Sequence, residues 1–211
     1  MVVSYEQWIK PKIVYNALEL LDKEIKSHKT RIKNVHLCFS TDPFMFKQEE
    51  IISLTLRIIE KLNADGIICS TLTKGIMPDL IMKVRGLLQE NIFGITLVSL
   101  NEEFRKYYEP FAATSEDRIA ALRRLHDNGL KTWVSIEPYP PPSIIEQDIM
   151  EILEAVSFVN KIVFGRWNYN SSVSKYKNLR EHYNKLSAQV IRFCKKNNII
   201  LHIKEGTLYN N

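Results

Sequence analysis

Short apolar runs alternate with longer amphipathic stretches along most of the chain. Six runs rich in β-branched or aromatic residues are candidate strands, at residues 34–39, 67–72, 93–98, 132–136, 162–164 and 199–203. Several of them are apolar without polar alternation, which is typical of strands covered on both faces. The repeated order of strand and helix predicts an α/β fold with parallel strands and helical crossovers.

The helices between these runs show apolar residues at helical spacing. Three stripes stand out: Ile51, Leu54, Ile58 and Leu62; Ile145, Ile149, Ile152, Val156 and Val159; and Leu179, Tyr183, Leu186, Val190 and Phe193. We interpret all three as core-facing rather than functional. A further helix over 117–128 is predicted to begin at a cap supplied by Thr114 or Ser115 and to end at Gly129.

Length and composition place the chain among ordinary globular proteins. A chain of 211 residues with 45% hydrophobic and 25% charged residues suits one core, so we predict a single domain over residues 1–211. The net charge of +5 and the pI near 9.0 admit a nucleic-acid partner. The basic residues are spread through the helices, which instead favours solvated faces.

No feature of the sequence directs the chain to a membrane or out of the cell. No apolar run approaches the roughly 20 residues that cross a bilayer, and the start of the chain lacks a signal-peptide pattern. Cys38, Cys69 and Cys194 form no CxxC or other close pair. We therefore expect a cytoplasmic protein with reduced thiols and no disulfide framework.

Polar residues follow each predicted strand, where the ligand site of a parallel α/β protein normally lies. The candidate binding residues are Ser40, Thr41, Asp42, Lys74, Thr96, Ser99 and Glu137. The alternative for any one of them is local capping of the next turn or helix. Lys74 and Glu137 are the most informative, since a charge at this edge needs a partner or a charged ligand. The Pro-rich segment 137–142 is predicted to be a stiff loop.

Other catalytic signatures are absent from the sequence. It contains no glycine-rich phosphate loop, no GxSxG and no HExxH, and its five histidines are scattered. No catalytic residue and no metal ligand is assigned from the residues alone.

Five stretches together resemble a known family. They are VHLCFSTDPF (35–44), TLTKGI (71–76), GITLVSLNEEF (94–104), YEPFAATSEDRIAALRRLHDNGLKTWVSIEPYPP (108–141) and FGRWNYN (164–170). In this order and spacing they resemble the spore photoproduct lyase-like branch of the radical S-adenosylmethionine (SAM) superfamily, over nearly the whole chain. The resemblance implies a partial (β/α) TIM-type barrel.

The resemblance also implies a cofactor and a reaction. In this family a 4Fe–4S cluster held by CxxxCxxC cleaves SAM reductively to a 5′-deoxyadenosyl radical, which takes a hydrogen atom from the substrate. By resemblance, Ser40 and Thr41, beside Asp42, line the methionyl end of SAM, and Lys74 pairs with its carboxylate. Thr96 and Ser99 then face the ligand from the next strand, and Glu137 from the one after.

The chain departs from the family pattern at the cluster. None of its three cysteines can replace three thiolates on one loop, so we expect no cluster on the 211 residues and no metal ligands among them. The resemblance places the first barrel strand and the CxxxCxxC motif upstream, and we expect the coding sequence to continue there. Without that strand, the edge around 35–39 invites association with another strand. The position of the family's hydrogen-donating cysteine falls on Phe39, so Cys38 receives no catalytic role.

Two other functions remain open from the sequence. The chain could be a cluster-free barrel module that binds a small ligand. It could also be an ordinary barrel enzyme that uses Lys74 and Glu137 as base and acid, if the two side chains are within reach. The substrate does not follow from any of these interpretations.

Overall fold

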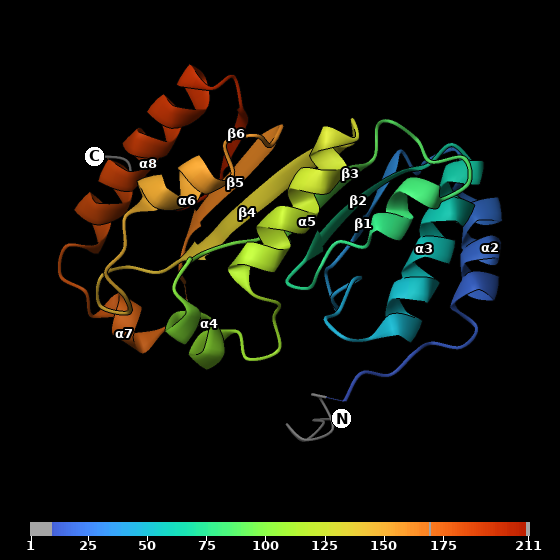
Figure 1. Ribbon diagram of the computed structural model, residues 1–211, viewed down its shortest axis with the longest axis horizontal. Helices are drawn as coiled ribbons and strands as arrows, with labels where there is room; N and C mark the ends of the chain where they lie inside the picture. Colours follow the sequence, from blue (N-terminus) through green and yellow to red (C-terminus); the bar gives the residue numbers. More distant parts are fainter. Residues whose placement is uncertain (1–9, 169, 210–211) are drawn as a thin grey trace.

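The computed structural model describes residues 10–168 and 170–209, which form one parallel sheet with helices between the strands (Figure 1). The six strands lie in the sequential order β1 to β6, and every neighbouring pair is parallel. They are β1 (Asn34–Leu37), β2 (Ile68–Thr73), β3 (Ile92–Thr96), β4 (Lys131–Tyr139), β5 (Lys161–Arg166) and β6 (Ile200–Ile203). The predicted α/β class and its partial (β/α) barrel are confirmed.

The helical segments follow the predicted alternation. They are α2 (Ala17–His28), α3 (Glu49–Ala64), η1 (Asp79–Lys83), α4 (Glu102–Tyr108), α5 (Ser115–Asp127), α6 (Ile149–Ala155), α7 (Ser171–Ser174) and α8 (Leu179–Lys196). In Figure 1, α4 and α7 lie beyond the carboxyl ends of β3 and β5. No helix in residues 10–168 and 170–209 is long and apolar enough to cross a bilayer.

The prediction of a loop over 137–142 is wrong for its first three residues. Glu137, Pro138 and Tyr139 continue β4, and Tyr139 pairs with Arg166 of β5. The register shifts between Ile136 and Tyr139. Proline has no N–H to donate, so it fits a strand where the regular ladder is interrupted.

The helix predicted from the stripe Ile145 to Val159 is shorter than that stripe. It begins after Asp148, whose side chain accepts a hydrogen bond from the Met150 backbone N–H at 2.9 Å. Val156 and Val159 lie after the helix but are still buried in the core. The apolar stripe therefore marks burial correctly and helix length incorrectly.

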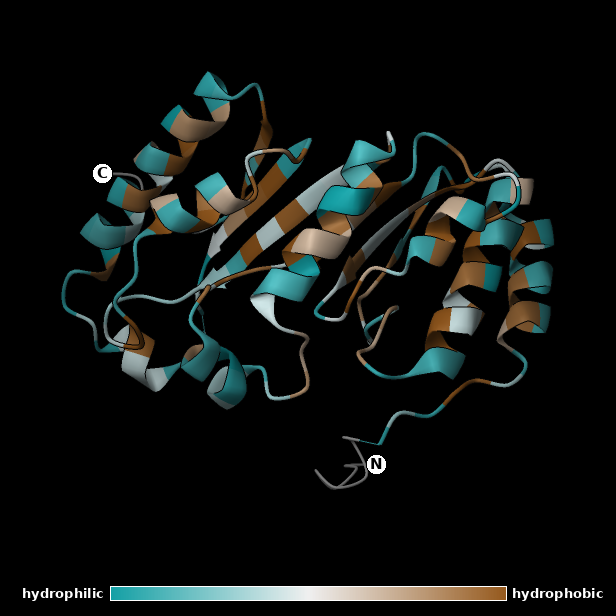
Figure 2. Cartoon of the chain, viewed as in Figure 1, coloured by the Kyte–Doolittle hydropathy of each residue, from teal (hydrophilic) through white to brown (hydrophobic). Residues whose placement is uncertain are grey.

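One face of the sheet packs on the helices and forms the core. Asn63 of α3 donates to Cys69 Sγ of β2 at 3.6 Å, which shows that this side of β2 faces the helix layer. The strand residues on the same side are buried and mostly apolar; they include Phe93, Ile95, Val134, Ile136, Ile162 and Phe164, together with the threonines Thr71, Thr73 and Thr132. Hydrophobic and hydrophilic bands alternate on the helices that cover them (Figure 2).

The opposite face, which we call the inner face, carries more polar residues. Alternation along β2 places Ser70, Leu72 and the following Lys74 there. The parallel register puts Gly94, Thr96, Trp133, Ser135, Val163 and His202 on the same face. Its polar side chains lie mainly toward the carboxyl ends of the strands.

Candidate functional site

The loop after β1 is fastened to the end of β2 by Asp42. Its Oδ1 accepts from the Thr73 hydroxyl at 2.5 Å and from the Phe44 N–H at 2.9 Å, and its Oδ2 accepts from the Lys74 N–H at 2.8 Å. Asp42 and Lys74 therefore lie side by side, as the sequence predicts. The hydrogen bonds of Asp42 are nevertheless those of a local structural residue. Ser40 and Thr41, just before it, are exposed.

Gly75 allows this loop to approach closely. A Cβ atom there would lie 1.9 Å from the backbone oxygen of Phe44, a distance that no side chain tolerates. The residue after Lys74 thus has to be glycine for the two loops to meet, and this fixes the backbone at the carboxyl end of β2.

Lys74 belongs to a three-residue ion network. Its Nζ lies 3.0 Å from Glu109 Oε1, and Arg118 Nη2 lies 3.1 Å from Glu109 Oε2. The Lys74 side chain is 44% exposed, whereas those of Glu109 and Arg118 are 5% and 1% exposed. The network therefore leads from the interior to the barrel mouth, which we define as the carboxyl-terminal edge of the inner face.

Arg118 is the buried end of this network. Its Nη1 donates to the carbonyl oxygen of Thr96 at 2.6 Å, and its Nε has no hydrogen-bond partner among the described residues. Burial lowers the pKa of the guanidinium, and the charge of Glu109 opposes that effect. A buried guanidinium of this kind is costly unless it is paired, and Glu109 supplies the pair.

Sequence reasoning missed both Glu109 and Arg118, because neither directly follows a strand. A signal was present for Arg118. It lies three, four and seven residues before Ala121, Leu122 and Leu125, on the buried face of α5. A charge on an apolar helical stripe needs a partner, and that partner is the Glu of the E-P pair at 109–110.

Glu137 lies on the inner face farther along the sheet. Its Oε2 is 3.5 Å from Lys204 Nζ, with side-chain exposures of 29% and 47%. Gly165 leaves room for it, since a Cβ there would lie 2.8 Å from Glu137 Cγ. β2 and β4 are separated by β3, and the register places Lys74 level with Ser135, so the backbones of Lys74 and Glu137 lie more than about 10 Å apart. Each charge has its own partner, so the two do not form a direct acid–base pair.

Thr96 and Ser99 differ in what surrounds them. Thr96 is buried at the end of β3, opposite Ser135 of β4, and its carbonyl holds Arg118. The Ser99 hydroxyl accepts from the Asn101 N–H at 3.1 Å, and its carbonyl accepts from Ser115. Ser99 therefore has a turn-forming role before α4, the alternative weighed for residues that follow strands.

The three cysteines do not form a cluster site. They lie near β1, in β2 and in α8, and no group of three or more His, Cys, Asp or Glu in the described residues could hold a metal ion. Cys38 Sγ is 2.7 Å from His36 Nε2. Burial, with the charge of Asp42, raises the pKa of the Cys38 thiol, and burial lowers the pKa of His36. A 4Fe–4S cluster, which needs thiolates, does not fit these residues.

An aromatic cluster borders the mouth, made of Phe104, Tyr107 and Tyr108 of α4 and Trp167 after β5. The Tyr108 ring lies 4.8 Å from that of Phe104 and 5.4 Å from that of Trp167. Tyr107 is 78% exposed and the nearby Phe111 is 63% exposed. Exposed aromatic rings beside a ligand site are typical of recognition surfaces.

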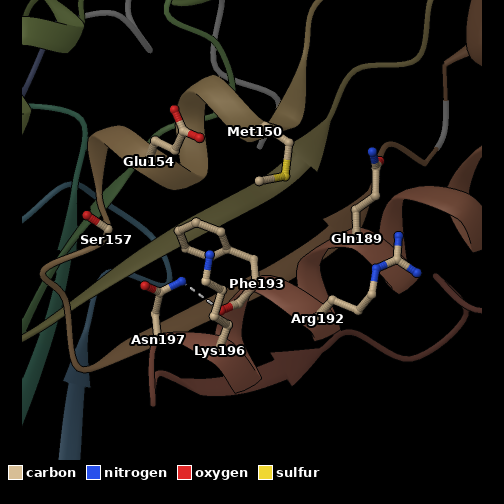
Figure 3. A pocket seen from close by; sticks show the side chains of 8 residues that line it. All are labelled: Met150, Glu154, Ser157, Gln189, Arg192, Phe193, Lys196 and Asn197. Carbon is tan, nitrogen blue, oxygen red and sulfur yellow. Dashed lines mark hydrogen bonds between the residues drawn. The ribbon is translucent and has the colours of Figure 1, made fainter.

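A separate groove of about 490 Å³ lies in the helix layer between α6 and α8, and Figure 3 shows its side chains. It is lined by Met150, Glu154, Ser157, Gln189, Arg192, Phe193, Lys196 and Asn197. None of these residues belongs to the inner face or to a loop at the barrel mouth. We therefore place the candidate site at the carboxyl ends of the strands rather than in this groove.

The model of the radical SAM superfamily matches residues 5–156 of the chain. Among curated proteins, the chain is 26% identical over 153 residues to an uncharacterized protein of Acidianus two-tailed virus. It is also 32% identical over 91 residues to an uncharacterized protein of Methanocaldococcus jannaschii. The matches cover 71% and 43% of this chain, but only 48% and 34% of those relatives. The chain thus spans at most about half the length of the curated relatives it matches.

Similar solved structures include spore photoproduct lyase complexed with dinucleoside spore photoproduct. That match has a TM-score of 0.66 and 14% identity, and covers 88% of this chain and 65% of the lyase. A domain of pyruvate-formate lyase-activating enzyme from Bacteroides vulgatus matches with a TM-score of 0.55 and 12% identity, over 81% of this chain and 98% of that domain. Streptococcus suis SuiB bound to S-adenosylmethionine matches with a TM-score of 0.55 and 10% identity, over 92% of this chain and 53% of SuiB. These likenesses show a shared fold.

Proposed function

The chain belongs to the radical SAM superfamily, and we propose that the mouth of its partial barrel binds S-adenosylmethionine, with Lys74 contacting the methionyl carboxylate. The single observation that carries the proposal is the environment of Lys74. Its ammonium follows β2 at the carboxyl edge and contacts Glu109 at 3.0 Å while 44% of the side chain stays exposed. An ammonium has three donors, so one can hold Glu109 while others meet a ligand.

The residues around Lys74 support a fixed rather than a mobile contact. Asp42 holds the Lys74 backbone N–H at 2.8 Å. Thr96, which follows on β3, is buried on the same face. A charge-assisted contact gains strength as its surroundings become drier. SAM would present its methionyl carboxylate and its nucleoside to the mouth, and the residues of the chain would bind and orient SAM there.

The reductive cleavage typical of the superfamily needs a cluster that the described residues do not hold. We therefore derive no radical step from them. The proposed activity of this chain is SAM binding, and the cleavage belongs to a protein that also supplies cluster ligands.

Titration calorimetry with SAM tests the proposal. Lys74→Met should weaken SAM binding at least about tenfold, since hydrogen bonds to charged groups contribute about 1.5–3 kcal/mol. Decarboxylated SAM, which lacks the carboxylate, should bind the wild type and Lys74→Met alike. Lys106→Met is the matched control, because Lys106 is exposed and pairs with Glu103 within α4. The proposal would be contradicted if Lys74→Met weakened the binding of SAM and of decarboxylated SAM equally, or if the wild type did not bind SAM.

For the substrate, two observations favour a nucleobase-containing molecule. The aromatic cluster beside the mouth offers the exposed ring of Tyr107 for stacking, and the nearby Phe111 offers another. The similar lyase structure is complexed with a dinucleoside spore photoproduct. Both observations support this class, in which bases stack on Tyr107 and Phe111.

Fluorescence anisotropy with a labelled oligothymidylate measures this binding. Tyr107→Ala should weaken it about fivefold or more, because stacking of one base on an aromatic ring contributes about 1–3 kcal/mol. Tyr15→Ala is the control, since Tyr15 is 97% exposed but lies before α2, away from the aromatic cluster. Equal affinities of the wild type and Tyr107→Ala would exclude the cluster as a base-binding surface.

A further inference from the structure

We infer that Glu109 and Arg118 are positioning residues for Lys74: together they hold its ammonium at the mouth and keep the site positive toward an anionic ligand group. Where it concerns SAM, this inference rests on the proposed function. Neither residue follows a strand, and neither lies where a ligand at the mouth would touch it, because both side chains are almost completely buried.

The first step of the argument is the burial of Glu109. Its carboxylate is 5% exposed, and each oxygen faces one cation, Lys74 at 3.0 Å and Arg118 at 3.1 Å. A buried carboxylate without a partner is strongly unfavourable. The exposed Lys74 side chain, which could otherwise sample many rotamers, is therefore held by a fixed acceptor beneath it.

The second step is the fixing of Glu109 itself. Arg118 donates through Nη1 to the carbonyl of Thr96 at 2.6 Å and through Nη2 to Glu109. The planar guanidinium holds its two donors in a rigid fork, so α5 and β3 together set where the carboxylate lies. The orientation of Lys74 thus depends on a residue that it does not contact.

The third step is charge. Lys74 and Arg118 each carry one positive charge and Glu109 one negative charge, which leaves the network with a net charge of +1. Without Arg118, Glu109 cancels Lys74 and the network becomes neutral. Without Glu109, the positive charge rises but Lys74 loses its acceptor. Asp42, which holds the Lys74 backbone, carries the same charge in every variant.

A simpler role for Arg118 would be to tie α5 to β3 through the Thr96 carbonyl. That role predicts a change in stability but none in the state of Lys74. The two roles differ in how readily the Lys74 amine reacts, because the contact with Glu109 at 3.0 Å holds the amine and restricts the approach of a reagent.

The deciding experiment measures the acylation rate of Lys74 in the folded, ligand-free chain, by competitive labelling and mass spectrometry. Lys106 in the same digest is the internal reference. Glu109→Gln should raise the rate of Lys74 at least about threefold. Arg118→Met should lower it about two- to threefold, since Glu109 then pairs with Lys74 alone. Arg118→Lys, which keeps the charge, should stay within about twofold of the wild type.

Unchanged Lys74 rates in both Glu109→Gln and Arg118→Met would overturn the inference. Circular dichroism identifies a variant that has lost its fold. If Arg118→Met is unfolded, the conservative variant Arg118→Lys is compared with the wild type instead. If Lys74 in a folded Arg118→Lys protein is acylated as fast as in the unfolded chain, the inference is also overturned.

SAM binding adds a second, separable readout. Arg118→Met should weaken SAM about fivefold or more while leaving decarboxylated SAM within about twofold. Failure of the wild type to bind SAM would count against the proposed function alone, since the acylation rates decide the positioning role without any ligand. Equal SAM affinity in the wild type and a folded Arg118→Met protein would overturn the charge-compensating part of the inference.

Discussion

At the scale of single residues, two buried thiols make the free energy of unfolding depend on pH. Cys69 and Cys194 are buried in the core, and burial raises the pKa of Cys69 to about 12 and that of Cys194 to about 11. A thiol in an unfolded chain ionises near pH 8.5. Above that pH the unfolded chain therefore holds fewer protons than the folded one, and stability falls.

The free energy of unfolding should be flat with respect to these thiols below about pH 8 and fall by about 1 kcal/mol or more for each thiol by pH 10. Urea unfolding at pH 7.5, 9 and 10 measures it. The double variant Cys69→Ala, Cys194→Ala should be less stable at pH 7.5 because it leaves cavities, yet show a shallower decline with pH. A decline as steep as that of the wild type would show that other groups cause the pH dependence.

Candidate residues could be predicted from their position after strands, but their roles could not. The pattern places Asp42 and Lys74 at one edge, and the structure brings them within hydrogen-bond distance. It does not separate Asp42, whose hydrogen bonds are local, from Lys74, whose ammonium reaches the mouth. That difference depends on Glu109 and Arg118, which meet Lys74 only through the tertiary fold.

At the scale of elements, α5 matters most because it carries Arg118. Thr114 caps it: the hydroxyl accepts from the Asp117 N–H at 3.1 Å and donates to the Asp117 carboxylate at 2.7 Å. The sequence predicts Thr114 or Ser115 as the cap, and the structure selects Thr114. A cap fixes where the first turn begins, and Arg118 lies in that turn.

Thr114→Ala should lower the free energy of unfolding by about 1 kcal/mol, the usual contribution of an N-cap side chain. Thr114→Ser keeps the hydroxyl oxygen and should recover most of that loss. Thermal or urea unfolding of the three proteins decides this. Equal stability of the Ala and Ser variants would mean that the hydroxyl contributes nothing to α5.

Element type is well predicted here and element length less so. All six candidate strands are present, because apolar β-branched runs between helical stripes are a strong pattern. β4 is longer than expected, since a proline at a register irregularity does not end a strand. α6 is shorter than its stripe, because residues after a helix can still pack into the core.

At the scale of the whole molecule, the parallel direction of the strands follows from the alternation of strand and helix. Alternation with right-handed crossovers also allows doubly wound orders, and it is the resemblance to a partial (β/α) barrel that implies the sequential order found in the structure. The carboxyl ends of all strands then share one edge, which is why a candidate site could be placed from the sequence. The buried residues beneath the site, Glu109 and Arg118, could not be predicted, because their contacts depend on long-range packing that the hydrophobic pattern does not encode.

The sequential order β1 to β6 also bears on how the chain assembles. Each strand pairs only with the strands adjacent to it in the sequence, so the sheet needs no segment that arrives late to fill a central gap. Parallel pairing across helical crossovers is slow, but the sequential order limits each crossover to the segment between two successive strands. A nascent chain leaving the ribosome can therefore pair β2 with β1 while β4 is still being synthesised, and extend the sheet one unit at a time.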